Sequence, residues 1–231
     1  MKRIIAFGGG DMQRKTTLEI DKHVATYAKE HAGDKRAYGL YIGTASHDFM
    51  PAFNTFRKIY TSVFDIKADC VITEKAVMDE EKINAKFLKA DFIFVGGGDT
   101  VYMLKRWQET GLITKILDAY NRGVTIVGRS AGAICWFENM YTDSYILRGE
   151  SKEYCFEKGL GLIKGLACPH YNLRDKDFDL SFSKSNFNSA VAIEDDCAVL
   201  YEDGNLVKSL SSGGKAYKIY KNNCEIIKES I

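Results

Sequence analysis

Short apolar runs alternate with longer amphipathic segments over the first two-thirds of the chain. The runs are rich in β-branched or aromatic residues and end before glycine, as at residues 38–42, 92–95 and 124–127. Continuously apolar strands of this kind are typical of a parallel sheet that is buried on both faces. Four other segments have helix-like spacing of apolar positions: residues 17–32, 52–63, 79–89 and 101–121. Asp79 can cap the third of these helices. The alternation predicts an α/β fold, a three-layer sandwich with a mostly parallel central sheet.

The last third of the chain has a different pattern. From Ala190 onward, short strand-like segments are separated by turn signals at residues 202–205, 212–214 and 222–223. Turns of this composition join antiparallel strands, so the sequence predicts a C-terminal antiparallel hairpin extension. The absence of a linker, a low-complexity tract or an internal repeat in the sequence favours a single domain over residues 1–231.

The composition excludes several classes of function. Hydrophobic residues make up 45% and charged residues 27% of the 231 positions, as in an ordinary globular protein. The 32 basic and 31 acidic residues nearly cancel, and the net charge of +1 gives no electrostatic case for binding nucleic acid. No apolar run in the sequence approaches the roughly 20 residues that are needed to span a bilayer. We therefore expect neither nucleic acid nor a membrane as a partner.

The N-terminal segment and the cysteines indicate a cytoplasmic protein. The first apolar run stops at Gly8, after residues 4–7, which is too early for a signal peptide and is typical of a first strand. The six cysteines, Cys224 among them, form no CxxC pair, and several lie inside apolar runs. We expect buried free thiols in a reducing compartment rather than disulfides.

The strongest local signal is Gly128-Arg129-Ser130-Ala131-Gly132, which follows a predicted strand and precedes a helix-compatible segment. This is the context that a G-x-S-x-G nucleophile elbow requires. Glycine at both ends leaves room for a tight turn, and the serine then projects at the positive end of the next helix. The backbone N–H of Ala131 would donate to an oxyanion. The alternative is a glycine-flanked turn in which Ser130 only caps a helix.

A second glycine cluster, Gly96-Gly97-Gly98-Asp99-Thr100, also follows a buried strand and opens a helix. In a parallel sheet such a loop lies at the carboxyl ends of the strands, where sites form. Gly97 or Gly98 could supply a second oxyanion donor, or the loop could bind phosphate at a helix N-terminus. The first cluster, Gly8-Gly9-Gly10, lacks the last glycine of a dinucleotide fingerprint. We interpret it as a turn that brings the backbone close to the site.

A hydrolytic serine needs a base, and the chain has four histidines. His23 and His31 lie among polar residues on the first predicted helix and are expected at the surface. His47 follows a strand and could line the cleft. His170 ends a short apolar strand and follows Pro169, which restricts the backbone before it. We therefore favour His170 over His47 as the base.

Three stretches of this sequence together resemble the peptidase E family of serine peptidases, the group that contains aspartyl dipeptidase and the more distant cyanophycinases. They are residues 92–100, 128–133 and 168–172, and their order and spacing agree with the family over residues 3–220. The resemblance implies a class I glutamine amidotransferase-like fold with serine at the elbow. It also implies a dipeptidase-like serine peptidase for small peptides, with a preference for an N-terminal acidic residue. Ser130 would be the nucleophile, His170 the base, and Gly98 and Ala131 the oxyanion hole.

The resemblance places the family's acidic residue at a strand end that matches residues 192–196. Glu194 aligns best, Asp143 is the competing choice, and Asp195 ranks third. Glu194 follows an apolar run, and its longer side chain suits a partner on a neighbouring strand. Asp143 instead follows a polar stretch that is typical of a loop. The acid would hold the imidazole tautomer and stabilise the imidazolium.

Two residues on the expected substrate side depart from the family's pattern. Asp99 stands where many relatives have asparagine, and Arg129 stands where aspartyl dipeptidases tend to have tryptophan. These two departures argue against a strict preference for N-terminal aspartate. Arg129, Arg148 and Arg174 are candidate clamps for a carboxylate, because a guanidinium can pair with it bidentately. The predicted substrate contacts are Gly97, Asp99, Arg129, Asn172 and Arg174.

The main alternative is a non-catalytic or glutamine amidotransferase-like binding protein of the same fold. The presence of both Ser130 and His170 argues against it, and Cys135 lies beyond the elbow. An α/β-hydrolase esterase would have the order Ser, acid, His, which Asp143 alone would satisfy. The sequence contains no H-E-x-x-H and no Cys/His cluster, so no metal or other cofactor is predicted. The expected partner is a small peptide substrate, and the sequence leaves monomer and homodimer open.

Overall fold

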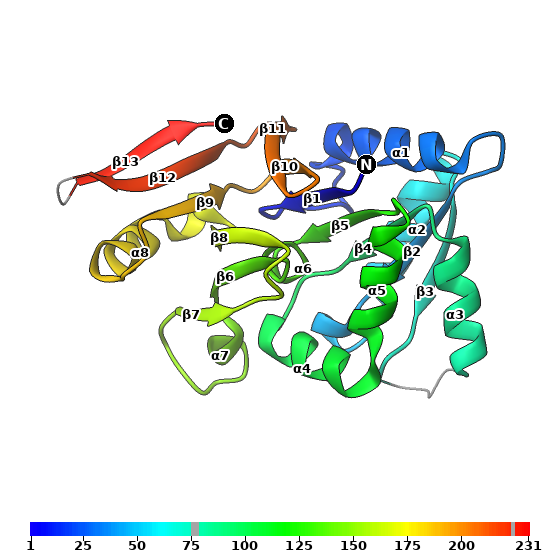
Figure 1. The fold of residues 1–231 in the computed structure, drawn as a ribbon, viewed down its shortest axis with the longest axis horizontal. Coiled ribbons are helices and arrows are strands. Elements are labelled where there is room, and N and C mark those ends of the chain that lie inside the picture. The colour runs from blue at the N-terminus through cyan, green and yellow to red at the C-terminus, as the bar shows by residue number, and fades with distance from the viewer. Residues whose placement is uncertain (75–78, 223–224) are drawn as a thin grey trace.

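The computed structural model describes residues 1–74, 79–222 and 225–231. Asn223, in the last predicted turn, and Cys224 lie outside the described residues. Two β-sheets with helices packed against them lie side by side, the first at the right of Figure 1 and the second at the left.

The first sheet has seven strands in the order β11-β10-β1-β5-β4-β2-β3. Their bounds are β1 (Arg3–Phe7), β2 (Tyr38–Ile42), β3 (Lys67–Val71), β4 (Phe92–Val95), β5 (Thr125–Arg129), β10 (Cys197–Glu202) and β11 (Asn205–Ser211). The strands from β1 to β3 pair in parallel, whereas β10 and β11 extend the sheet with antiparallel pairing. The carboxyl ends of the parallel strands therefore share one edge, where sites form in sheets of this kind.

Helices cover both faces of this sheet. One face packs on α1 (Leu18–Ala32) and α2 (Met50–Ser62). The other packs on a larger set: α3 (Glu80–Lys89), α4 (Thr100–Thr110), α5 (Leu112–Asn121) and the short α6 (Ala131–Ile134). A short 3-10 helix, η1 (Thr44–Ser46), follows β2.

Strand β4 shows why the apolar runs in this sequence are continuous. Phe92 and Phe94 pack into the core under α1 and α2. Ile93 and Val95 pack into the core on the opposite face. Successive side chains of a strand point to opposite faces, so a strand covered on both sides needs an apolar residue at every position.

The second sheet has six strands in the order β13-β12-β9-β8-β6-β7. Their bounds are β6 (Phe137–Thr142), β7 (Cys155–Lys158), β8 (Ile163–Cys168), β9 (Ser189–Ile193), β12 (Ala216–Asn222) and β13 (Glu225–Ser230), with helices α7 (Ser144–Leu147) and α8 (Tyr171–Lys184) between them. The three strands β6, β8 and β9 are parallel, and the others are antiparallel to their neighbours.

One hydrophobic core connects the two sheets. Met140 of β6 and Ala167 of β8 belong to the same buried cluster as Ile93 and Ile126 of the first sheet. A separate cluster, which includes Phe178, fills the space between the second sheet and α8. The second sheet is thus packed against the first by one face and covered by α8 on the other.

The strands after Ala190 pair antiparallel as predicted, β10 with β11 and β12 with β13, but they do not form one extension. β10 and β11 complete the edge of the first sheet, while β9, β12 and β13 belong to the second. The predicted turn at residues 202–205 joins β10 to β11, whereas residues 212–214 lead from β11 in the first sheet to β12 in the second and join no hairpin.

Two other local predictions differ from the structure. Residues 101–121 form two helices, because Gly111 adopts a left-handed conformation, with φ of 68°, that ends α4. The polar stretch before Asp143 is strand β6 rather than a loop. Its Asn139 is buried but accepts a hydrogen bond from Lys158 Nζ at 2.9 Å, which satisfies its carbonyl oxygen. The predicted cap on α3 is confirmed, since Asp79 accepts from the backbone N–H of Glu81 at 3.0 Å.

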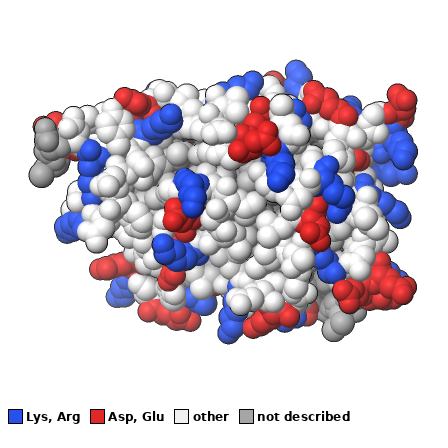
Figure 2. Space-filling view, viewed as in Figure 1, with Lys and Arg blue, Asp and Glu red and all other residues white. Residues whose placement is uncertain are grey.

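Side chains of both charge signs are interspersed over the face shown in Figure 2. Within the described part of the chain, no helix is both long and apolar enough to cross a membrane. The five described cysteines are free thiols: Cys70, Cys135, Cys155, Cys168 and Cys197.

Candidate active site

Ser130 sits on a sharp turn between β5 and α6, at the carboxyl edge of the first sheet. Its φ of 54° lies in the left-handed region, a strained conformation for a residue with a side chain. The turn is packed tightly on both sides, because a β-carbon at Gly128 would overlap the carbonyl of Gly132, and one at Gly132 would overlap the carbonyl of Val95. This is the strand-turn-helix geometry expected of a nucleophile elbow.

His170 lies against Ser130 from the second sheet. It follows β8 and precedes α8, and its backbone N–H donates to the carbonyl of Gly8 at 3.1 Å. Its Nε2 is 2.8 Å from Ser130 Oγ, across 40 residues of sequence. The predicted pairing of the nucleophile with this histidine is therefore present in the structure as a hydrogen bond.

Asp195 is the carboxylate that contacts the imidazole. Its Oδ1 lies 2.6 Å from His170 Nδ1. A carboxylate only accepts, so Nδ1 carries the proton and Nε2 is free to accept from the Ser130 hydroxyl. The hydrogen bond from His170 is the main cause that holds the pKa of Asp195 below its usual value, against the opposing effect of burial. Asp195 therefore remains ionised beside the histidine.

The prediction that Glu194 contacts His170 is wrong. The Glu194 carboxylate turns toward the second sheet, where it accepts from the backbone N–H of Lys215 at 2.9 Å and from the Tyr217 hydroxyl at 3.2 Å. Neighbouring residues of an extended chain point to opposite sides. Asp195, the third choice, consequently faces the histidine while Glu194 faces away.

Asp143, the second choice, pairs with an arginine instead. Its Oδ2 is 2.9 Å from Arg174 Nη2. The Arg174 side chain is only 5% exposed, and its guanidinium also lies 4.8 Å from the centre of the Tyr154 ring. This buried guanidinium is one helical turn beyond His170 on α8 and contributes, more weakly than His170, to the lowered pKa of Asp195.

Asn172 was predicted to contact substrate but is bonded to the acid. Its Oδ1 accepts from the backbone N–H of Asp195 at 2.9 Å, and its Nδ2 donates to Asp195 Oδ2 at 3.4 Å. These bonds orient the Asp195 carboxylate toward His170. No sequence signal distinguished this role, because Asn172 and Asp195 are distant in the chain.

The glycine loop after β4 lies beside Ser130. A β-carbon on Gly97 would be 3.2 Å from Ser130 Cβ and 3.7 Å from its Oγ. Among the described residues, the backbone N–H groups of Gly97, Gly98 and Ala131 have no acceptor. The elbow and this loop therefore present unpaired donors near the Ser130 hydroxyl, as an oxyanion hole requires.

The loop after β1 brings its backbone against the candidate triad. A β-carbon on Gly9 would overlap both the imidazole of His170 and the carboxylate of Asp195. The Gly8-Gly9-Gly10 cluster at a strand end was the available signal, and its interpretation as a turn that brings the backbone close agrees with the structure.

The other candidate residues have partners outside the Ser130–His170–Asp195 group. Asp99 is buried, caps α4 by accepting from Tyr102 N at 2.9 Å, and pairs with Arg148 Nε at 3.4 Å. His47 is exposed and packs on the Tyr102 ring, with the ring centres 4.3 Å apart. His23 and His31 are exposed on α1, as predicted.

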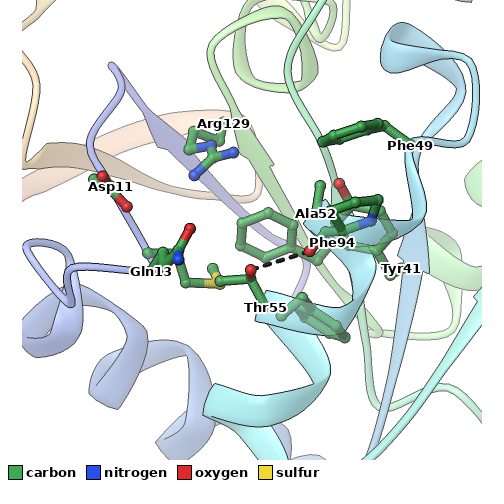
Figure 3. A pocket seen from close by; sticks show the side chains of 11 residues that line it. Asp11, Gln13, Tyr41, Phe49, Ala52, Thr55, Phe94 and Arg129 are labelled. Carbon is green, nitrogen blue, oxygen red and sulfur yellow. Dashed lines mark hydrogen bonds between the residues drawn. The ribbon is translucent and has the colours of Figure 1, made fainter.

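The Arg129 side chain points to the face of the first sheet that packs on α1 and α2, opposite to the face covered by α6. There it lines a pocket with residues of the loop after β1 and of α2 (Figure 3). Over the described residues, no group of three or more His, Cys, Asp or Glu side chains is arranged to hold a metal ion.

The sequence profile of peptidase family S51 matches residues 4–208 of this chain. The chain is 30% identical over 235 residues to the uncharacterized peptidase YgaJ of Bacillus subtilis strain 168, and the match covers 98% of this chain and 95% of that protein. A shorter match, over 45 residues, is 47% identical to peptidase E of Salmonella newport strain SL254 and covers 20% of each chain.

Two solved structures resemble the whole fold. A peptidase from an acI-B1 Actinobacterium superposes with a TM-score of 0.71 at 17% identity, covering 100% of this chain and 96% of that one. A proposed peptidase E protein of Listeria monocytogenes EGD-e superposes with a TM-score of 0.59 at 19% identity, covering 100% and 99%. At these identities the likeness shows a shared fold.

Proposed function

Because this chain belongs to peptidase family S51, we propose that it is a serine peptidase that hydrolyses small peptides, with Ser130 as nucleophile, His170 as general base and Asp195 as the acid. The observation that carries the proposal is the continuous chain of hydrogen bonds from Ser130 Oγ through His170 to Asp195, with lengths of 2.8 and 2.6 Å. The three groups come from different parts of the sequence and meet at the carboxyl edge of the first sheet.

The first half of the reaction forms an acyl-enzyme. His170 Nε2 takes the proton of the Ser130 hydroxyl as Oγ attacks the carbonyl carbon of the scissile peptide bond. The N–H groups of Ala131 and of the Gly97–Gly98 loop stabilise the oxyanion. The C–N bond then breaks, and the imidazolium returns its proton to the leaving amine. Asp195, held ionised, stabilises the imidazolium in between.

The second half uses water as the nucleophile. His170 removes a proton from a water molecule that attacks the ester carbonyl, and the proton is then given to Ser130 Oγ as the ester C–O bond breaks. The products are the amine released first and a carboxylate, and the enzyme regains its starting state. The charge on Asp195 is needed in both halves, because the imidazolium forms twice.

A thiol mechanism at Cys135 has less support. This residue is fully buried, and its Sγ lies 3.4 Å from the carbonyl of Gly132. Burial raises the pKa of the Cys135 thiol well above its usual value. The thiolate that such a mechanism requires is therefore disfavoured.

Further features belong to the proposal. We propose a dipeptide-sized substrate and test for a preference for an N-terminal acidic residue. The class I glutamine amidotransferase-like fold is supported by a nucleophile at the end of a parallel strand. The cytoplasmic location is supported by the free state of the described cysteines.

A fluorophosphonate probe tests the nucleophile directly. We expect one label per chain, mapped by peptide mass spectrometry to Ser130, together with loss of peptide hydrolysis. Ser130→Ala should abolish both, whereas Ser46→Ala, a serine at the same edge of the sheet, should retain both. A label on another serine, or hydrolysis that survives in Ser130→Ala, would refute the assignment. A panel of dipeptides with N-terminal Asp, Glu, Ala and Leu then measures the side-chain preference.

A further inference from the structure

Arg129 occupies a pocket that the proposed reaction does not use. The pocket lies on the α1 and α2 face of the first sheet and has a volume of about 190 Å³. Figure 3 shows the Arg129 side chain entering the space between the loop that carries Asp11 and Gln13 and the start of α2. Gly128 packs against α6 on the other face, so alternation along β5 directs Arg129 away from α6.

Among the described residues the guanidinium of Arg129 makes no direct contact with a carboxylate, although it acts electrostatically on the buried Asp21 carboxyl. The one hydrogen bond of Arg129 is from Nη1 to the carbonyl of Gly10 at 3.3 Å, and no ion pair joins it to any acidic group in the described ranges. Asp11, which also lines the pocket, is engaged by Arg14 through its backbone N–H at 3.0 Å and its Nε at 3.5 Å. Most of the guanidinium donors are therefore available to a ligand.

The other walls of the pocket are largely apolar. The rings of Tyr41, Phe49, Phe56 and Phe94 line it, with Met12 and Ala52. A cavity of about 150 Å³ with apolar walls accommodates a benzene molecule, so a ring-sized apolar group fits here. Arg129 is partly buried, and its guanidinium would gain from an anionic partner that forms charge-assisted hydrogen bonds.

We propose that this pocket binds a carboxylate carried on a small apolar body, with Arg129 receiving the carboxylate and the aromatic walls enclosing the body. The inference goes beyond the proposed function and does not depend on it. The ligand could be a free carboxylic acid or the carboxylate of a bound peptide, because both present the same chemistry. Gly10, whose carbonyl bonds Arg129, adjoins Gly9, which contacts His170 and Asp195. Consecutive residues of this loop therefore contact the pocket and the candidate triad.

Calorimetric titration with phenylacetate, and with the neutral phenylacetamide as its isostere, tests the proposal. We expect saturable binding of phenylacetate to the wild type, and binding of the amide that is weaker by about tenfold or more, as the loss of a charged hydrogen-bonded pair implies. Arg129→Gln should weaken phenylacetate binding by about the same factor. Arg57→Gln is the matched control, because Arg57 is an exposed arginine on α2 outside the pocket lining and should leave the affinity unchanged.

A second variant guards against misfolding of the first. Thr55→Phe keeps Arg129 but places a ring in the pocket that Thr55 lines, and it should also abolish binding. Thermal melts verify that each variant is folded. The proposal is overturned if the wild type does not bind phenylacetate, if acid and amide bind equally, or if folded Arg129→Gln binds as the wild type does.

Two further measurements identify the source of the carboxylate. If the carboxylate belongs to the peptide substrate, phenylacetate will inhibit hydrolysis competitively. If the ligand is a separate molecule, phenylacetate will bind Ser130→Ala equally well with and without peptide. If the wild type binds phenylacetate but hydrolyses no peptide of the panel, the proposed function is contradicted and the assignment of the pocket stands.

Discussion

The Cα of Gly9 lies so close to Asp195 that a β-carbon at this position would overlap the carboxylate Oδ1. The same β-carbon would overlap the His170 ring, and the neighbouring Gly8 accepts the backbone N–H of His170 at 3.1 Å. The loop after β1 thus packs directly against His170 and Asp195, the two side chains that would activate Ser130. The φ of Gly9 is not positive, so its backbone conformation does not require glycine. Glycine is required because a side chain would not fit between this loop and the two side chains.

We predict that Gly9→Ala lowers kcat strongly while the protein remains folded. The added methyl group must displace the imidazole or the carboxylate, and a displacement of about 1 Å at such a site costs about 100-fold in rate. Steady-state kinetics and thermal melts measure the two effects separately. Gly149→Ala is the control, because its φ of 73° is strained for alanine but nothing lies near its Cα. It should melt at a lower temperature and retain its kcat, and an equal loss of kcat in both variants would contradict the explanation.

We predict that Asp195→Asn lowers kcat by about 10³- to 10⁴-fold with little change in KM. The amide would present an N–H to His170 Nδ1 and favour the wrong imidazole tautomer. Glu194→Gln should change kcat by less than about tenfold, because Glu194 bonds Lys215 and Tyr217 instead. Steady-state kinetics on both variants, with thermal melts to verify that each is folded, show which carboxylate acts on His170. A large loss in Glu194→Gln beside a near-normal Asp195→Asn would reverse the assignment of the acid.

Asn172 should act as a positioning residue. Its two bonds to Asp195 orient the carboxylate and help to lower its pKa. In Asn172→Ala we expect kcat to fall by about tenfold, the order of one lost hydrogen bond to a charged group, with KM little changed. Loss of activity through protonation of Asp195 should set in at a higher pH than in the wild type, because the Asp195 carboxylate becomes easier to protonate without Asn172. A change confined to KM would instead indicate that Asn172 contacts the substrate.

The stability of the protein should depend on the protonation of Asp21. This carboxyl is buried on α1, accepts from Thr17 at 2.8 Å and from Tyr60 at 2.9 Å, and burial raises its pKa from 3.8 to about 6. A raised carboxyl pKa adds stability that is fully present below the unfolded value and is lost as the pH rises through about 6.

Urea unfolding between pH 4 and pH 8 measures this effect. The free energy of unfolding of the wild type, relative to that of Asp21→Asn, should fall by up to about 3 kcal/mol over this range, from the difference between the two pKa values. Asp34→Asn removes an exposed carboxylate and should leave the wild-type pH dependence in place. If Asp21→Asn has the same pH dependence as the wild type, another group is responsible.

Local sequence determined the elements that depend on neighbouring residues. The apolar runs at Tyr38–Ile42 and Phe92–Val95 coincide with β2 and β4, because a strand buried on both faces needs an unbroken run of apolar residues. The elbow at Ser130 was also evident from sequence, since its tight turn requires the glycines on either side of it. His170 could be singled out because it follows a proline at a strand end.

Tertiary structure alone decided which groups meet. Glu194 and Asp195 are adjacent acids at the end of β9, and their sequence context does not tell which one points to His170. The packing of the β9 end against Gly8 and the bonds of Glu194 to the start of β12 set that direction. In the same way, Arg129 adjoins the nucleophile in sequence, but its place on β5 turns it to the other face of the sheet. A chain pattern specifies the alternation of side chains along a strand, whereas only long-range pairing specifies what each face meets.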